Sequence, residues 1–80
     1  MAVLLLFGPA RTAAGTNRVA IDAPSVAALC AVARDRFGNG FAAVLDTSAI
    51  WVNGEPLAGD APLRAEDEVA VLPPVSGGMR

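Results

Sequence analysis

Two short apolar runs near opposite ends of the chain constrain the fold more than any other feature of this 80-residue sequence. They are AVLLLF at 2–7 and VAVL at 69–72. Each run has the length of a strand, but polar and apolar residues do not alternate in it as they do in a strand with one solvent-exposed face. We therefore expect both runs to be strands near the middle of a sheet and buried under a helix, and the first run to be covered on both faces.

One main helix is predicted between these runs, in APSVAALCAVARDRFGNG at 23–40. Ser25 suits the N-cap of this helix, and Gly38 or Gly40 can supply the left-handed residue that ends it. Apolar residues recur at a spacing of three or four and form one helical face, made of Val26, Leu29, Cys30, Ala33 and Phe37.

The other segments are predicted from alternation and turn signals. PARTAAGTN at 9–17 is expected to be a loop or short turn, leading into NRVAI, a half-buried strand that pairs antiparallel with the first run. FAAVLD at 41–46 is expected to add a further helical turn. AIWVNGEPL is a hairpin that turns at Asn53-Gly54, and GDAPLRAED is a loop before the last strand, which Pro73 ends.

The resulting order, ββαβββ, is typical of an α+β fold in which one main helix packs across a small mixed sheet. This is the β-grasp, or ubiquitin-like, arrangement, and its first and last strands lie side by side and parallel. We expect a β-grasp domain over 1–72 and a flexible C-terminal tail over 73–80, with a diglycine and a two-residue extension.

Composition excludes several classes of partner. The net charge is −2, and all six basic residues are Arg, scattered singly along the chain, so a nucleic-acid partner is not expected. No apolar run approaches the roughly 18 residues of a membrane span. The first apolar run also lacks the positive charge that precedes a signal-peptide core. We expect a cytoplasmic protein without a membrane partner.

The residue inventory argues against chemistry carried out by the chain alone. There is no His, Lys or Tyr, and a single cysteine can form neither an intramolecular disulfide nor the usual Cys/His zinc site. Cys30 lies among small apolar neighbours that do not lower a thiol pKa, so we expect it to be a core thiol. No metal site and no stably bound cofactor are expected.

The segment PPVSGGMR at 73–80 suits insertion into another protein. Pro73 and Pro74 stiffen its base, while Gly77 and Gly78 have no side chain and allow close backbone approach. Residues 73–78 can extend up to roughly 20 Å, which is enough to thread a narrow tunnel. The alternative is an ordinary frayed terminus.

These residues carry a resemblance to a known family. With LLFGPAR at 5–11, Gly15, Val52-Asn53, Pro62-Leu63 and DEVAVLPPVSGG at 67–78, the chain resembles the MoaD/ThiS family of ubiquitin-like sulfur carriers, which includes the small subunit of molybdopterin synthase. The strand followed by PPVSGG is the most specific part. The chain departs from the family pattern at Glu66, where Gly is frequent, and in continuing through Met79-Arg80.

The resemblance implies that sulfur is carried as a thiocarboxylate on Gly78, with Gly77 giving access. A ubiquitin-activating-like adenylating enzyme would use ATP and Mg²⁺ to form an acyl-adenylate, and a sulfur donor would replace AMP. The large subunit of molybdopterin synthase would then use the sulfur, so the chain itself would be a non-catalytic subunit. Because Met79 ties up the Gly78 carboxyl group, we expect a processing protease to remove Met79-Arg80.

Partner binding is expected to involve an exposed sheet face together with Phe7, Pro73, Pro74, Val75 and Ser76. Phe7 and Trp51 are expected to be core or sheet-face residues rather than residues that stack on a ligand, and either can still rim a protein interface. The acidic run at 66–68 can either steer a basic partner or simply solvate a turn.

Two other functions stay open. One is sulfur delivery to thiamine thiazole or to cysteine synthesis, although the PPV lead-in at 73–75 favours molybdopterin. The other is action as a ubiquitin-like modifier or a binding module. With no lysine, the chain cannot form lysine-linked chains of itself.

Overall fold

The computed structural model describes residues 1–73, so the predicted tail from Pro74 to Arg80 lies outside the described residues. One five-stranded sheet, in the order β2-β1-β5-β3-β4, carries three helices within this range. The elements in chain order are β1 (Ala2–Leu6), α1 (Pro9–Ala14), β2 (Arg18–Ile21), α2 (Val26–Phe37), α3 (Asn39–Asp46), β3 (Ala49–Val52), β4 (Glu55–Pro56) and β5 (Glu68–Leu72). The predicted α+β, β-grasp class is confirmed.

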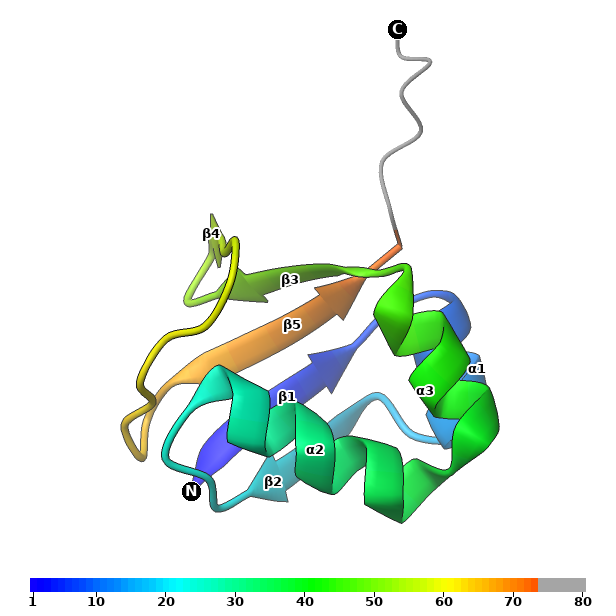
Figure 1. Ribbon diagram of the computed structural model, residues 1–80, viewed down its shortest axis with the longest axis horizontal. Helices are drawn as coiled ribbons and strands as arrows, with labels where there is room; N and C mark the ends of the chain where they lie inside the picture. Colours follow the sequence, from blue (N-terminus) through cyan, green and yellow to red (C-terminus); the bar gives the residue numbers. More distant parts are fainter. Residues whose placement is uncertain (74–80) are drawn as a thin grey trace, which may run out of the picture.

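The two apolar runs meet at the centre of the sheet as parallel neighbours (Figure 1). Leu4 pairs with Val69 and Leu6 with Val71, so β5 is inserted between β1 and β3 although it comes last in the chain. The pairings of β2 with β1 and of β3 with β5 are antiparallel. The predicted parallel pairing of first and last strands is correct.

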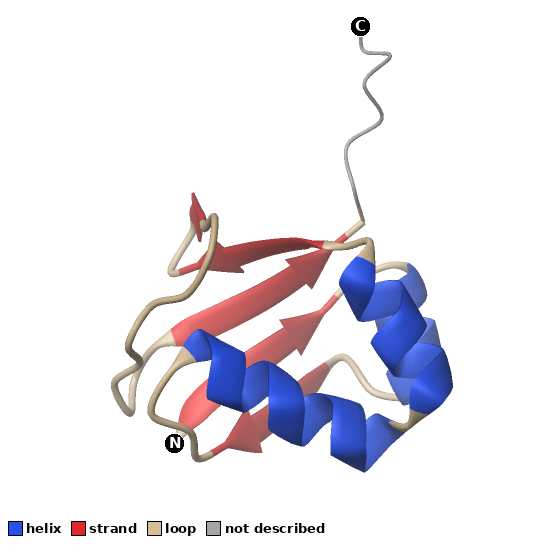
Figure 2. Ribbon diagram, in the orientation of Figure 1, coloured by secondary structure: helices blue, strands red, loops and turns tan. Residues whose placement is uncertain are grey.

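The hydrophobic core lies between the sheet and α2, which crosses one face of it, as Figure 2 shows. The α3 and α1 helices lie at the end of the sheet where β1 and β5 finish. Among residues 1–73, every buried side chain belongs to this one cluster, made of Ala2, Leu4, Leu6, Ala10, Ile21, Val26, Leu29, Ala33, Phe41, Leu45, Val69 and Val71. The helices therefore cover one face of the sheet.

Residues 9–14 form a helix, so the prediction of a loop or short turn there was wrong. Pro9 starts α1 with a preset φ, and Ala10 is buried in the core at 1% exposure. Gly15 ends the helix in the left-handed conformation, at φ 77° and ψ 13°. Ala10 and the partly buried Ala14 are the small residues that pack this helix against the core, and so short a segment gives no readable hydrophobic period.

The segment after α2 is a full helix rather than one added turn. Gly38 ends α2 and starts α3 at φ 91°, a conformation that favours glycine. The ring of Phe41 is fully buried, with its centroid 5.1 Å from that of Phe37, and Leu45 is also buried in the core. These two anchors, four residues apart, hold α3 against α2.

The start of α2 is fixed by two caps. The hydroxyl of Ser25 accepts a hydrogen bond from the Ala28 N–H at 3.1 Å, as predicted for this N-cap. The predicted loop at 59–67 supplies the second cap, because Asp60 Oδ1 accepts from the Ala27 N–H at 2.8 Å. Two helix N–H groups that lack partners within the helix are thus satisfied.

The predicted hairpin turn at Asn53-Gly54 is present, with φ 51° at Asn53 and 84° at Gly54. The Asn53 side chain also fixes the start of β5: its Oδ1 accepts from the Glu68 N–H at 2.9 Å, and its Nδ2 donates to Asp67 at 3.0 Å. The backbone N–H of Arg64, and then the Asn53 amide, lower the pKa of Asp67 below its ordinary value of 3.8.

Candidate functional site

The face of the sheet opposite α2 is apolar. Strand residues that alternate with the core positions point to this face, which no helix of residues 1–73 covers. We call it the open face, and define it by Val3, Leu5, Phe7, Trp51, Ala70 and Leu72. All are half-buried except Phe7, which is 44% exposed. The expectation that the first run is covered on both faces was wrong, because only one face has helices over it.

The strand register brings open-face side chains from three strands together. Leu5 of β1 pairs with Ala70 of β5, and Ala70 pairs in turn with Trp51 of β3. The small side chain of Ala70 thus lies between a leucine and a tryptophan. A contiguous apolar patch rimmed by polar residues is typical of a protein interaction site.

The chain leaves the sheet beside this patch, at Pro73. Strands β1 and β5 are parallel and finish at the same end, so Phe7 follows β1 next to the point where Leu72 ends β5. The Phe7 N–H donates to the Val71 carbonyl at 3.1 Å. This hydrogen bond continues the pairing of β1 with β5 by one residue beyond Leu6. Phe7 and Pro73 are both exposed. An aromatic side chain therefore stands at the base of the predicted tail.

The predicted site residues divide into two sets. Phe7 and Pro73 lie together at the exit from the sheet, and Phe7 is on the open face rather than in the core. The others lie outside the described residues: Pro74, Val75, Ser76, Gly77 and Gly78.

Prediction from the sequence missed Leu5 and Leu72 as members of the open face. A signal for them was present. The sequence contains one long amphipathic helix, which can cover one sheet face only, while the two central strands carry apolar residues for both faces. The surplus apolar side chains had to be exposed.

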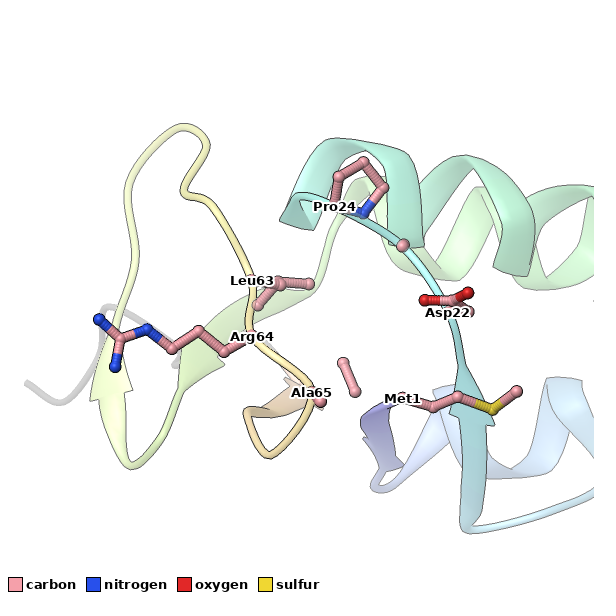
Figure 3. Close-up of a pocket in the computed structure, with 8 residues that line it drawn as sticks. Met1, Asp22, Pro24, Leu63, Arg64 and Ala65 are labelled. Carbon is pink, nitrogen blue, oxygen red and sulfur yellow. The ribbon is translucent and has the colours of Figure 1, made fainter.

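The other hollows of the surface do not gather reactive groups. Figure 3 shows one of them, of about 310 Å³, at the end of the sheet opposite to Pro73. Met1 and Leu63 line it, and the side chain of Arg64 is directed away from Met1 and Asp22. Within residues 1–73 no three potential metal ligands cluster, and no helix there has the length and apolarity to cross a membrane.

Cys30 is half-buried beside the core. Burial raises the pKa of its thiol, Arg34 offsets this in part, and Asp60 adds to it. The thiol is therefore mostly protonated, and a poor nucleophile, near neutral pH.

Comparison with known proteins identifies the family. Residues 4–78 match the model of the ThiS family. A comparison with curated proteins gives no match. Among solved structures, small archaeal modifier protein 1 of Methanosarcina acetivorans has a TM-score of 0.83 at 26% identity, covering 96% of this chain and 95% of that one. The same protein from Haloferax volcanii gives 0.75 at 27%, covering 96% and 98%.

A further similar structure is a complex of subunits 1 and 2 of the molybdopterin-converting factor from Helicobacter pylori. Its matching chain has a TM-score of 0.74 at 27% identity, covering 96% of this chain and 97% of that chain. The family match spans nearly the whole sequence, including the strand-PPVSGG segment, and the fold agrees with these structures over almost their full length. The chain therefore belongs to the ThiS family of ubiquitin-like sulfur carriers.

Proposed function

We propose that this protein carries sulfur as a thiocarboxylate on Gly78 and delivers it to molybdopterin synthesis as the small subunit of molybdopterin synthase. The observation that carries the proposal is the parallel pairing of β1 with β5. Because of this pairing, the chain leaves the sheet at Pro73, beside the apolar open face. Docking of that face would aim the PPVSGG segment at a partner's active site.

The chain's own residues contribute binding and reach rather than catalysis. The open face and Phe7 bind the partner, and the double proline limits the entropy lost when the tail inserts. Gly77 and Gly78 leave room for a nucleotide beside the backbone. In the adenylating partner the Gly78 carboxylate attacks the α-phosphate of ATP and releases pyrophosphate. A sulfur donor then displaces AMP.

Adenylation requires that Met79-Arg80 be removed first, because the Gly78 carbonyl is otherwise part of an unreactive amide. The family match, which ends at Gly78, supports this step. The test compares a chain ending at Gly78 with one ending at Arg80, each incubated with ATP, Mg²⁺ and the purified adenylating enzyme. We expect AMP transfer to the shorter chain alone. Equal transfer to the 80-residue chain, with its last two residues still attached, contradicts the processing step.

The docking role of the open face can be tested with two matched alanine variants. Phe7 and Val32 are 44% and 42% exposed, but only Phe7 lies on the open face, whereas Val32 is on α2. Phe7→Ala should weaken binding to the large subunit about tenfold or more, as loss of an aromatic anchor does, without lowering the melting temperature. Val32→Ala should bind normally. Equal affinities of the two variants rule out this docking surface.

The choice of molybdopterin synthesis over other sulfur acceptors is supported by the PPV lead-in at 73–75 and by the likeness to a molybdopterin-converting factor chain captured with its second subunit. Reconstitution with purified large subunits of different pathways tests this choice. We expect sulfur transfer from the thiocarboxylate form to the molybdopterin precursor and none to a thiazole precursor.

A ubiquitin-like modifier is the second candidate, because two similar structures are of small archaeal modifier protein 1. Both functions begin with activation of a C-terminal glycine, and they differ in what attacks it. Intact mass spectrometry of the native protein separates them. A thiocarboxylate supports the carrier, an isopeptide bond to another protein supports the modifier, and an unaltered terminus contradicts both.

A further inference from the structure

Strand β2 forms one edge of the sheet (Figure 2). Half of the backbone N–H and C=O groups of an edge strand face away from its neighbour. The Leu6 N–H donates to the Asn17 carbonyl at 3.0 Å, and Leu4 pairs with Val19 in the same register. Bonds to β1 alternate along an antiparallel strand. Arg18 and Ala20 therefore direct their N–H and C=O groups to the outside.

The outward groups of β2 are incompletely satisfied. The Thr16 hydroxyl donates to the Arg18 carbonyl at 3.2 Å and lies 3.5 Å from the Arg18 nitrogen, a long contact that leaves this N–H only weakly bonded. A carbonyl oxygen has a second lone pair and can accept again. Within residues 1–73, Ala20 is exposed, and no other group bonds its outward N–H or C=O. An edge of this kind is a template for another strand.

We propose that the β2 edge pairs antiparallel with the β2 edge of a second copy of this chain, centred on Ala20. In this register the Ala20 residues of the two copies exchange both backbone hydrogen bonds. Arg18 of each copy then lies opposite Asp22 of the other, so two pairs of opposite charge face each other across the dimer axis.

Charge complementarity selects this register over its neighbours. Sliding the strands by two residues in either direction leaves Arg18 and Asp22 opposite uncharged residues. Sliding them by four places Arg18 opposite Arg18 of the second copy in one direction, and Asp22 opposite Asp22 in the other. Directly opposed like charges destabilise a strand pair, so only the register centred on Ala20 is favourable at both flanking positions.

The symmetry of this contact makes the dimer compatible with the proposed docking. A two-fold axis through an antiparallel strand pair is normal to the sheet, so the two copies form one ten-stranded sheet with both sets of helices on the same side. Both open faces stay uncovered. The two Pro73 residues leave at opposite ends of the joined sheet, because β5 of one copy runs against β5 of the other.

The contact is small, because only about five residues of each copy line up along the edge. It falls below the ~1,200 Å² of most stable complexes, so we expect a weak dimer that forms at high concentration. Charge should therefore decide a large part of its affinity, which makes charge-reversal variants informative.

The test is sedimentation analysis of the full 80-residue chain at increasing concentration, up to about 1 mM, with circular dichroism to verify folding. Arg18→Glu and Asp22→Arg should each weaken self-association about tenfold, because each places two like-charged pairs across the axis. An equimolar mixture of the two variants should recover association, because their opposed charges become complementary. Glu55→Arg makes the same charge change as Asp22→Arg but on β4, at the other edge of the sheet, and should leave association as in the wild type.

Three results would overturn the proposal: a wild type that stays monomeric over this range, charge variants that associate as well as the wild type, or a mixture that associates no better than its components. If a charge reversal prevents folding, the milder Arg18→Gln and Asp22→Asn replace it. Each of these must then weaken self-association, or the proposal fails.

Discussion

Gly8 and Pro73 lie so close together that a side chain at position 8 would fit only if the Pro73 ring moved by a few tenths of an ångström. A Cβ atom built on Gly8 falls 3.2 Å from Cγ of Pro73 and 3.5 Å from its Cδ. Gly8 also adopts φ +57° and ψ −131°, a conformation that residues with a Cβ rarely take. Gly8, which follows Phe7, thus packs directly against Pro73, the first residue after β5, at the point where the chain leaves the sheet.

Gly8→Ala should lower the free energy of unfolding by about 1–3 kcal/mol, mainly through the strained φ and in addition through the tight approach of the new methyl group to Pro73. Gly15→Ala is the matched control, because Gly15 has φ +77° but no neighbouring atom within 4 Å of the position that an alanine methyl group would take. Urea denaturation of the two variants measures the difference. We also expect Gly8→Ala, but not Gly15→Ala, to reduce binding to the large subunit. Equal effects of the two substitutions on binding would show that the Gly8–Pro73 contact does not position the tail.

Asp60 should matter more for stability than its exposed position indicates. Its Oδ1 accepts from the N–H groups of Ala27 and Ala61, both at 2.8 Å, and so ties the loop to the start of α2. We expect Asp60→Ala to cost about 1–2 kcal/mol, as loss of a helix cap does. Asp35→Ala, an exposed position on α2 with the same charge change, should be near neutral. Thermal melts of both variants check this, and similar melting temperatures contradict the capping role.

Stability should depend on pH through Asp67. The native pKa of Asp67 is lowered, so its ionised form is favoured in the folded state, and the stabilisation is fully present above the unfolded value, near 3.8. It is lost as the pH falls through the lower, folded value. Unfolding of wild type and Asp67→Asn should therefore differ most near neutral pH and converge below pH 3.8. Glu66→Gln controls for net charge. A difference that does not shrink in acid contradicts this assignment.

Cys30 should be dispensable for sulfur transfer. Burial raises the pKa of its thiol, so the reactive thiolate is scarce at neutral pH. Cys30→Ala should cost about 1 kcal/mol of stability at most, because a small, half-buried group is removed. Iodoacetamide should label the native protein more slowly than the unfolded one. A folded Cys30→Ala chain that cannot accept or donate sulfur with purified partners would place the chemistry at the thiol instead of at Gly78.

The strands and α2 were predictable because their signals are local. Apolar runs, the three-to-four spacing of α2 and the Asn53-Gly54 turn each lie within a few residues of one another. Helix α1 was not predictable, since Ala10 is its sole fully buried residue and the helix depends on tertiary packing. The hydrogen bond between the Ala27 N–H and the Asp60 carboxylate likewise joins residues that are 33 apart in sequence, and no local pattern reveals it.

The candidate site was predictable in part. The exposed position of Phe7 at the exit from the sheet agrees with its assignment to partner binding, which stays a prediction, as does the role of the tail motif outside the described residues. The remainder of the open face depends on which side of β1 the helices cover, and therefore on the strand register. Leu5 and Leu4 look alike in sequence, yet Leu4 is 1% exposed and Leu5 faces outward.

The parallel pairing of β1 with β5 also determines when the protein can fold during its synthesis. Until the ribosome has released Glu68–Leu72, β1 lacks its neighbour on one side, and Val69 and Val71 are missing from the core. Until then the apolar first strand stays unfolded in the nascent chain. The backbone N–H and C=O groups that later pair with β5 are unpaired and can associate with non-native partners. Because this central contact is so distant in sequence, we expect folding to be late and nearly all-or-none.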